Sequence, residues 1–146
     1  MTETGLSQEA RLRRLEDLEE IRQLFVDYGH LLDLGDFAAY AQLFAEDGEL
    51  MLGPLGRAAG RRQIEAMMAR VGGAGASLHL ITSPMVTLDG DRATARVMWT
   101  VINRDGDGTP LLGMVGHHED ELVREGGRWR FRRRRGFVEI PNAVRR

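Results

Sequence analysis

Two residue types are missing from this chain of 146 residues, and each absence removes a class of chemistry. Without cysteine there is no disulfide, no thiol nucleophile and no Cys-based zinc or iron–sulfur site. Without lysine, since all 20 basic residues are Arg, there is no Schiff base and no attached pyridoxal phosphate. No apolar run approaches membrane-spanning length, and the polar N-terminal residues 1–10 do not resemble a signal peptide. We therefore expect a cytoplasmic protein.

The length and the balance of charge indicate a compact globular chain. We expect a single domain over residues 1–146, with flexible termini at 1–9 and 142–146. The formal net charge of −2 provides no general attraction to nucleic acid or to an anionic membrane, so we expect neither as a partner.

The most informative stretch is the end of the first predicted helix. Apolar residues at spacings of three and four predict an amphipathic helix over about 10–34, ended by Gly35. Asp33 lies near the end of this apolar stripe, where an acid costs several kcal/mol unless it is paired or lines a cavity. The sequence therefore predicts a partner for Asp33 elsewhere in the chain.

The remaining elements change from helical to strand periodicity near residue 77. We expect a short helix after Asp36 that includes Phe44, a turn at Asp47-Gly48, a strand over 49–52, a helix over 60–71 and a hinge over 72–75. Four strands then follow over 77–88, 92–104, 111–124 and 128–140. The order α-α-β-α-β-β-β-β predicts an α+β fold with three helices on one face of a curved, mainly antiparallel sheet.

His79 is the first candidate partner for Asp33. It alternates with Leu78 and Leu80, so its side chain faces the side opposite to theirs. A carboxylate that accepts from one imidazole nitrogen fixes the tautomer and prepares the other nitrogen to act as a general base without a metal. The alternative is a half-buried histidine whose hydrogen bonds are satisfied within the fold.

The adjacent pair His117-His118 is a poor metal site. Neighbours on a strand point to opposite faces, so only one imidazole can enter a cavity, and His118 shares its parity with apolar Leu122. We expect His118 to point inward and His117 outward, and we expect no metal. The glycines match neither a dinucleotide fingerprint nor a phosphate-binding loop, so no cofactor is expected either.

The arginine-rich run over 128–135 is superficially typical of a nucleic-acid patch. On a strand, however, its arginines divide between two faces, and the neighbouring strand carries acids at 119–121 and 125 that can neutralise them. Cross-strand neutralisation is the favoured interpretation. Trp129 and Phe131 share parity with Arg133 and Arg135, so the alternative is an inward arginine at one of these two positions that binds an anionic or carbonyl group of a substrate.

Several short motifs, spread over about residues 10–140, resemble those of the SnoaL-like branch of the NTF2-like superfamily. They are Tyr28-x4-Asp33-x-Gly35-Asp36, Leu43-Phe44-Ala45-Glu46-Asp47-Gly48, Gly60 before Ile64, Ser77-Leu78-His79, Leu88-Asp89-Gly90-Asp91-x-Ala93, Gly116-x-His118-x-Asp120-x-Leu122 and Gly127-x-Trp129-Arg130. The resemblance implies a cone in which a strongly bent sheet wraps around helices and leaves a deep pocket. The nearest types are scytalone dehydratase and bile-acid 7α-dehydratase, although this chain lacks the second tyrosine that the scytalone type has near Met51.

The resemblance also implies the residues of a site. Asp33 and His79 match the Asp–His pair of the dehydratases, and Tyr28 matches a tyrosine of the bile-acid type, so these three are the predicted catalytic residues. The predicted substrate-binding residues are His118, Asn103, Arg135, Trp99, Met51 and Met114.

The expected function is that of a cofactor-independent lyase of dehydratase type acting on a hydrophobic cyclic or aromatic small molecule. Two alternatives stay open. One is an isomerase or polyketide cyclase with Asp33 itself as the base, and the other is a non-catalytic module that binds a small ligand. By the same resemblance we expect a homo-oligomer, either a dimer or a trimer.

Overall fold

The computed structural model describes residues 5–72 and 75–141 of the chain. Its elements, in chain order, are α1 (Gln8–Leu34), α2 (Phe37–Gln42), β1 (Phe44–Met51), the 3₁₀ turn η2 (Gly53–Leu55), β2 (Arg57–Ala59), α3 (Arg61–Val71), β3 (Ser77–Asp89), β4 (Arg92–Arg104), β5 (Pro110–Glu125) and β6 (Arg128–Ile140). In the described ranges, no helix combines the length and the apolar character that a membrane crossing needs.

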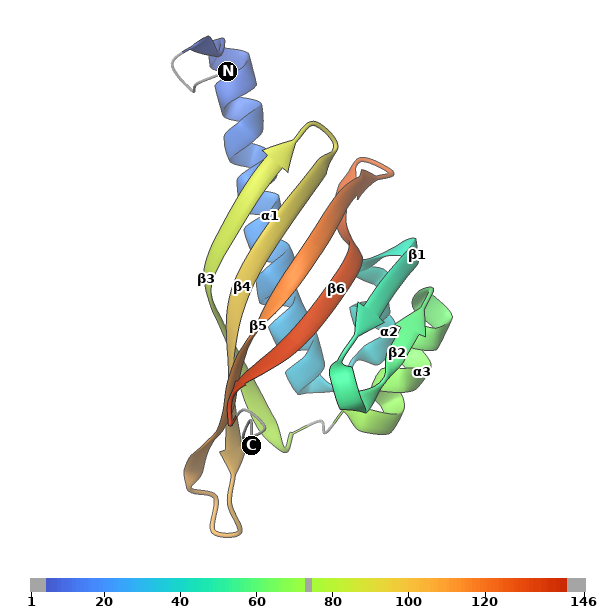
Figure 1. The fold of residues 1–146 in the computed structure, drawn as a ribbon, viewed down its shortest axis with the longest axis vertical. Helices are drawn as coiled ribbons and strands as arrows, with labels where there is room; N and C mark the ends of the chain where they lie inside the picture. Colours follow the sequence, from blue (N-terminus) through green and yellow to red (C-terminus); the bar gives the residue numbers. More distant parts are fainter. Residues whose placement is uncertain (1–4, 73–74, 142–146) are drawn as a thin grey trace, which may run out of the picture.

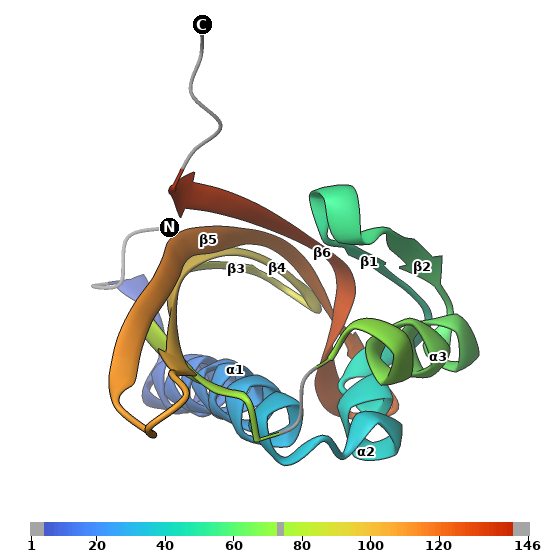
Figure 2. The same cartoon turned by 90° about the horizontal axis from the view of Figure 1, so that it is seen from below.

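The strands form one curved sheet that wraps around the first helix. The strand order is β2-β1-β6-β5-β4-β3, and every neighbouring pair is antiparallel except the parallel pair β1–β6. Figure 1 shows the face of the sheet with α1 behind it, and Figure 2 shows β3, β4 and β5 arching over α1 while α2 and α3 lie beside the β1–β2 end. The predicted α+β class, with three helices on a curved and mainly antiparallel sheet, is confirmed.

Helix α1 starts and stops where its sequence signals predict, within two residues. The Ser7 side chain accepts a hydrogen bond from the Ala10 amide at 3.1 Å, and Gly35 ends the helix in the left-handed conformation with φ 75°. Its apolar stripe, which includes Ile21, Phe25 and Tyr28, is buried in the main core. Gln8 and Glu9, which belong to the segment 1–9 that the sequence predicts to be flexible, form the first residues of α1.

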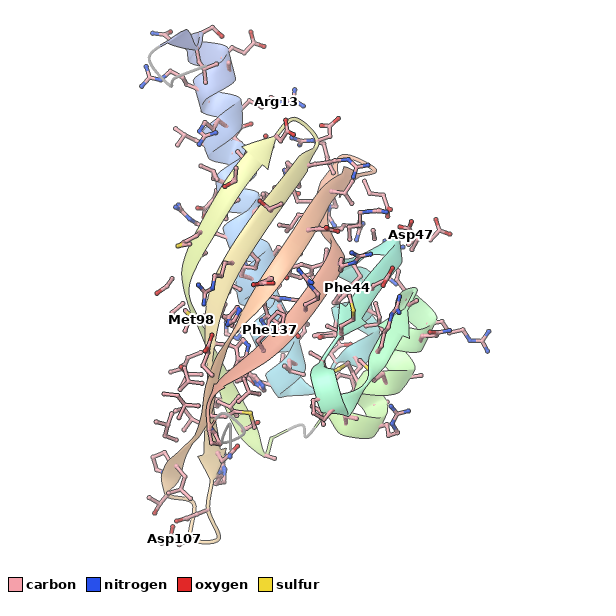
Figure 3. The ribbon with its side chains drawn as sticks, in the orientation of Figure 1. Arg13, Phe44, Asp47, Met98, Asp107 and Phe137 are labelled. Carbon is pink, nitrogen blue, oxygen red and sulfur yellow. The ribbon has the colours of Figure 1, made fainter. Side chains whose placement is uncertain are left out.

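The segment after α2 differs from the sequence prediction. Phe44 begins β1 instead of ending a helix, and Asp47-Gly48 lies inside that strand instead of forming a turn. Figure 3 shows Phe44 and Asp47 on this same strand. The pairing of β1 with β6 shifts register between Phe44 and Glu49, and a Cβ on Gly48 would lie only 2.9 Å from the carbonyl oxygen of Phe131. Gly48 therefore serves a close approach of two strands, not a turn.

Two further differences concern short segments. The three-residue strand β2, which pairs with the end of β1, has no signal in the sequence strong enough to predict it. Residues 1–4 and 142–146 of the predicted flexible termini, and residues 73–74 of the predicted hinge, lie outside the described residues.

Candidate active site

A cavity of about 290 Å³ opens between α1, α3, the η2 turn and the concave face of β3–β6. Its walls are mainly apolar, as Leu32, Leu52 and Met68 illustrate. Seven of the nine predicted site residues line it: Tyr28, Asp33, His79, Trp99, Asn103, Met114 and His118. The cavity thus gathers residues from α1, β3, β4 and β5 that are up to 90 positions apart in the sequence, from Tyr28 to His118.

Asp33 and His79 are in direct contact at one side of the cavity. The ring nitrogen Nδ1 of His79 lies 2.6 Å from Asp33 Oδ1, and the backbone amide of His79 donates to both carboxylate oxygens at 3.1 Å. The two side chains keep modest exposure, 14% for Asp33 and 21% for His79. With Nδ1 engaged by the carboxylate, Nε2 is the imidazole nitrogen left to meet a ligand.

A glycine one helical turn before Asp33 allows this contact. A Cβ on Gly29 would lie 3.1 Å from Cγ1 of Ile81 and 3.5 Å from the carbonyl oxygen of His79. Because position 29 carries no side chain, α1 packs tightly against β3, and the acid four residues later reaches the start of that strand. As the alternation predicts, Leu78 and Leu80 point to the other face, where they are 58% and 51% exposed.

Tyr28 lies deeper in the same cavity. Its side chain is only 2% exposed, and its ring packs 4.9 Å from the Tyr40 ring. The Arg134 guanidinium lies over the Tyr28 ring, 4.0 Å from its centre. Burial raises the pKa of Tyr28 above 10.0, and the positive charge of Arg134 offsets only part of that rise. The phenol therefore keeps its proton at neutral pH and can donate a hydrogen bond.

His118 points inward from β5, as its parity predicts. Its ring meets the Tyr28 ring edge-on at 5.4 Å and packs 6.0 Å from the Trp99 ring. Burial, reinforced by the charge of Arg134, holds the pKa of His118 well below 6.5, so the imidazole is neutral at pH 7. His117 lies on the outer face, where its Nδ1 is 2.6 Å from Glu139 Oε1 and its ring stacks on Phe137.

A sealed ion pair lies beneath Tyr28 and His118. Asp120 and Arg134 have side chains that are 0% exposed, with Nε 3.0 Å from Oδ1 and Nη2 donating to Oδ2 at 3.3 Å. Nε and Oδ1 are close but not aligned for a hydrogen bond, so the hydrogen bond of this pair is the one from Nη2 to Oδ2. Burial raises the pKa of Asp120 to about 6, against the opposing pull of Arg134.

The inward arginine is therefore not the one that strand parity predicts. The pairing of β5 with β6 shifts register between Glu121 and Leu122, so alternation breaks after Phe131 and Arg134 turns inward. Arg135, predicted to lie in the pocket, is instead on the outer face, where its guanidinium lies 3.2 Å from Glu119. The prediction that Arg133 or Arg135 points inward is wrong, because the inward residue is Arg134, which lies in the core beneath the cavity and does not line it.

Met51 is the other predicted residue outside the cavity. It precedes Leu52, which lines the cavity wall together with Leu55, so alternation turns Met51 away. Within the part of the chain that the structure describes, no group of three or more His, Asp or Glu side chains is arranged to hold a metal ion. The roles assigned to the site residues stay predictions.

Comparisons with known proteins agree with this architecture. A family model described as a SnoaL-like domain matches residues 13–135. An uncharacterized protein of Mycobacterium tuberculosis is 30% identical over 123 residues, which cover 82% of this chain and 84% of the relative.

Two solved structures from Novosphingobium aromaticivorans are similar in fold. An NTF2-like protein with a cystatin-like fold is 36% identical, with a TM-score of 0.83 over 92% of this chain and 90% of that chain. A putative scytalone dehydratase is 23% identical, with a TM-score of 0.72 over 90% of this chain and 91% of that chain, and this likeness concerns the fold alone.

Proposed function

Because this chain belongs to the SnoaL-like family, within the NTF2-like superfamily, we propose that it is a cofactor-independent lyase of dehydratase type. Its substrate is a hydrophobic cyclic or aromatic small molecule, in keeping with a mainly apolar cavity of about 290 Å³. The single observation that carries the proposal is the 2.6 Å contact between Asp33 Oδ1 and His79 Nδ1, at the wall of that cavity.

In this reaction His79 is the general base. Asp33 holds the imidazole by Nδ1, so Nε2 takes the proton from an acidic C–H beside a carbonyl group. Tyr28, a neutral phenol in the cavity, donates a hydrogen bond to the enolate oxygen as it develops. The electrons of the enolate then form the alkene as the C–O bond to the hydroxyl breaks, and the proton held on His79 Nε2 passes to the hydroxyl, which leaves as water. His118 or Asn103, which also line the cavity, assist its departure.

The isomerase or cyclase alternative requires Asp33 to act as the base. Both oxygens of this carboxylate already accept hydrogen bonds from the His79 backbone amide, and Oδ1 also meets the ring. These contacts favour Asp33 as the residue that orients the base over Asp33 as the base itself. A non-catalytic module has no need of an oriented imidazole, so the same contact argues against it.

Three variants test the mechanism with 3-hydroxy-1-tetralone, whose loss of water produces 1-naphthol. We expect His79→Ala and Asp33→Asn each to lower kcat/KM by ~10²–10⁴-fold while the protein stays folded. His30→Ala, an exposed histidine on α1, is the matched control and should retain activity. Near-wild-type turnover in both His79→Ala and Asp33→Asn would refute the mechanism.

The same assay separates the alternatives. With Asp33 as the base, His79→Ala would be mild, Asp33→Asn severe, and the product would keep the mass of its substrate by mass spectrometry. A metal-dependent reaction would be lost after treatment with a chelator, whereas we expect activity to survive it.

We further propose that the chain forms a homo-oligomer through the outer face of the sheet. The exposed Leu78 and Leu80 lie on this face. It also carries both Arg96 and Glu139, 3.6 Å apart, so a second copy offers charges of both signs. Light scattering during size exclusion should give the mass of a dimer or trimer, and Leu80→Glu should shift it toward the monomer.

A further inference from the structure

The deepest part of the cavity is built around His118, a residue that the proton abstraction by His79 does not need. Gly136 on β6 lies directly opposite His118 in the sheet. A Cβ on Gly136 would approach the His118 ring to 3.4 Å at Cδ2 and 3.5 Å at Nε2, and would reach the Leu52 side chain at 3.3 Å. Because position 136 has no side chain, a notch remains beside the Nε2 edge of the imidazole.

The two nitrogens of His118 have different surroundings. Nδ1 is fully enclosed and has no hydrogen-bond partner, and Trp99 Nε1 is enclosed in the same way. Nε2 is not among the enclosed atoms, although His118 as a whole is only 5% exposed and lines the cavity. Nε2 is therefore the nitrogen with access to a ligand.

The position of the single ring proton follows from this asymmetry. An enclosed N–H without an acceptor is rarer and costs more than an enclosed lone pair without a donor. The proton is therefore on Nε2, and Nδ1 keeps its lone pair. A second proton would place a cation near Arg134, and the carboxylate of Asp120 is already paired with that arginine.

We propose that His118, with the notch at Gly136, forms a subsite that donates one hydrogen bond from Nε2–H to an uncharged acceptor oxygen of the substrate. This subsite rests on the proposed function only in that one small molecule fills the cavity and meets His79 and His118 at different atoms. It specifies the substrate class as a neutral, oxygenated ring compound.

Charge selects against other ligands at this end of the cavity. A ligand cation would lose its hydration without gaining a counterion, because the Asp120 carboxylate is sealed and paired with Arg134. A ligand carboxylate would lose its hydration without gaining a counterion, because the Arg134 guanidinium is sealed from the cavity and paired with Asp120. A carbonyl, ether or hydroxyl oxygen needs only the one donor that His118 presents.

Binding of three matched probes tests this subsite without turnover. 1-Tetralone has a neutral acceptor oxygen, tetralin has the same rings without oxygen, and 1-naphthoate has a negative charge. By calorimetry, wild-type protein should prefer 1-tetralone to tetralin by about five- to tenfold and should gain nothing from 1-naphthoate. His118→Phe should lower the preference, with the remainder due to the hydrogen bond that Tyr28 can donate to a carbonyl oxygen, and His118→Gln, which keeps an amide donor, should retain more of it. No preference in the wild type, or an unchanged preference in His118→Phe, would overturn the proposal.

A second measurement on the wild type avoids variants that fail to fold. Nitrogen chemical shifts of the imidazole rings identify the tautomer directly, with exposed His30 as the reference signal. We expect His118 to be neutral with its proton on Nε2 at neutral pH, and a proton on Nδ1 or an imidazolium would refute the assignment. If His79→Ala and Asp33→Asn both stay fully active while the 1-tetralone preference depends on His118, the proposed lyase mechanism fails and the subsite stands. The reverse result removes the subsite alone.

Discussion

Two carboxylates of this chain each face a nitrogen-bearing side chain, but water reaches only one of the two pairs. Asp33 and His79 keep side-chain exposures of 14% and 21% at the edge of the cavity. Asp120 and Arg134 are 0% exposed beneath it. The first pair has a ring nitrogen to offer to a ligand, whereas the second has no free access to the cavity at all.

Because of this difference in exposure, the Asp33–His79 pair and the Asp120–Arg134 pair suit different roles. An imidazole gains and loses a proton near neutral pH, so a carboxylate beside it can orient a base, whereas a guanidinium keeps its charge. The sealed pair instead supplies a fixed charge among the buried aromatic rings beneath the cavity, with the Arg134 guanidinium 4.0 Å from the Tyr28 ring and 4.3 Å from the Phe131 ring. We therefore expect the open pair to govern turnover and the sealed pair to govern folding.

The largest effect should follow from breaking the sealed pair. Arg134→Met leaves the Asp120 carboxylate buried without a counterion, which should lower the free energy of unfolding by about 3–5 kcal/mol in urea denaturation. The double variant Arg134→Met with Asp120→Leu replaces both charges by apolar groups and should recover most of that loss. A double variant as unstable as the single one would mean that the pair stabilises the fold in its own right.

Tyr28 contacts the sealed pair and also lines the cavity, so its substitutions separate a role in folding from a role in turnover. Tyr28→Phe keeps the ring against Arg134 but removes the hydroxyl, and should lower kcat/KM by ~10²–10³-fold. The loss in unfolding free energy should stay near about 1 kcal/mol, the net value of one hydrogen bond. Tyr28→Ala removes the ring too and should cost about 3–5 kcal/mol of stability. If Tyr28→Phe loses stability but not activity, the hydroxyl serves the fold instead of the reaction.

The open pair could be predicted from the sequence because each half has a local signal. Asp33 is an acid near the end of an apolar helical stripe, and His79 alternates with two leucines at a strand start. Both signals depend only on regular periodicity, which α1 and β3 keep around these residues. Neither signal contains Gly29, whose missing side chain brings the two elements into contact.

Of the sealed pair, the inward position of Asp120 could be predicted from the sequence, but that of Arg134 could not. Asp120 shares the inward parity of His118 and Leu122, but Arg134 turns inward because the register shifts at Glu121–Leu122. A register shift inserts a residue into an alternating pattern, and no residue type in this run of arginines marks its place. The misplaced strand start at Phe44 has the same kind of cause, since β1 also shifts register against β6.

His118 lies between the two pairs and should respond to pH. Its pKa in the folded protein is well below 6.5, so below about pH 6.5 the unfolded chain binds the extra proton and stability falls. From about pH 6.5 to about pH 5.5 the wild type should lose about 1 kcal/mol more unfolding free energy than His118→Phe.

The raised pKa of Asp120, about 6, acts in the opposite direction, because there the folded state binds the extra proton. This effect of Asp120 is present in the wild type and in His118→Phe alike, so it cancels when the stability losses of the two proteins are subtracted. Equal losses in urea unfolding at the two pH values would show that His118 becomes protonated in the fold as easily as in the unfolded chain.

The smallest effect should come from Asp33→Asn measured as stability. The asparagine carbonyl oxygen can still accept a hydrogen bond from the His79 amide, and the pair is partly exposed, so the change should be at most about 1 kcal/mol. Urea denaturation of this variant beside Asp120→Asn provides the direct contrast, because the second substitution leaves Arg134 charged and sealed. A loss of about 3 kcal/mol or more in Asp33→Asn would make the two pairs equivalent for folding. The activity lost in Asp33→Asn could then no longer be assigned to the orientation of His79, since a disturbed fold would explain it equally well.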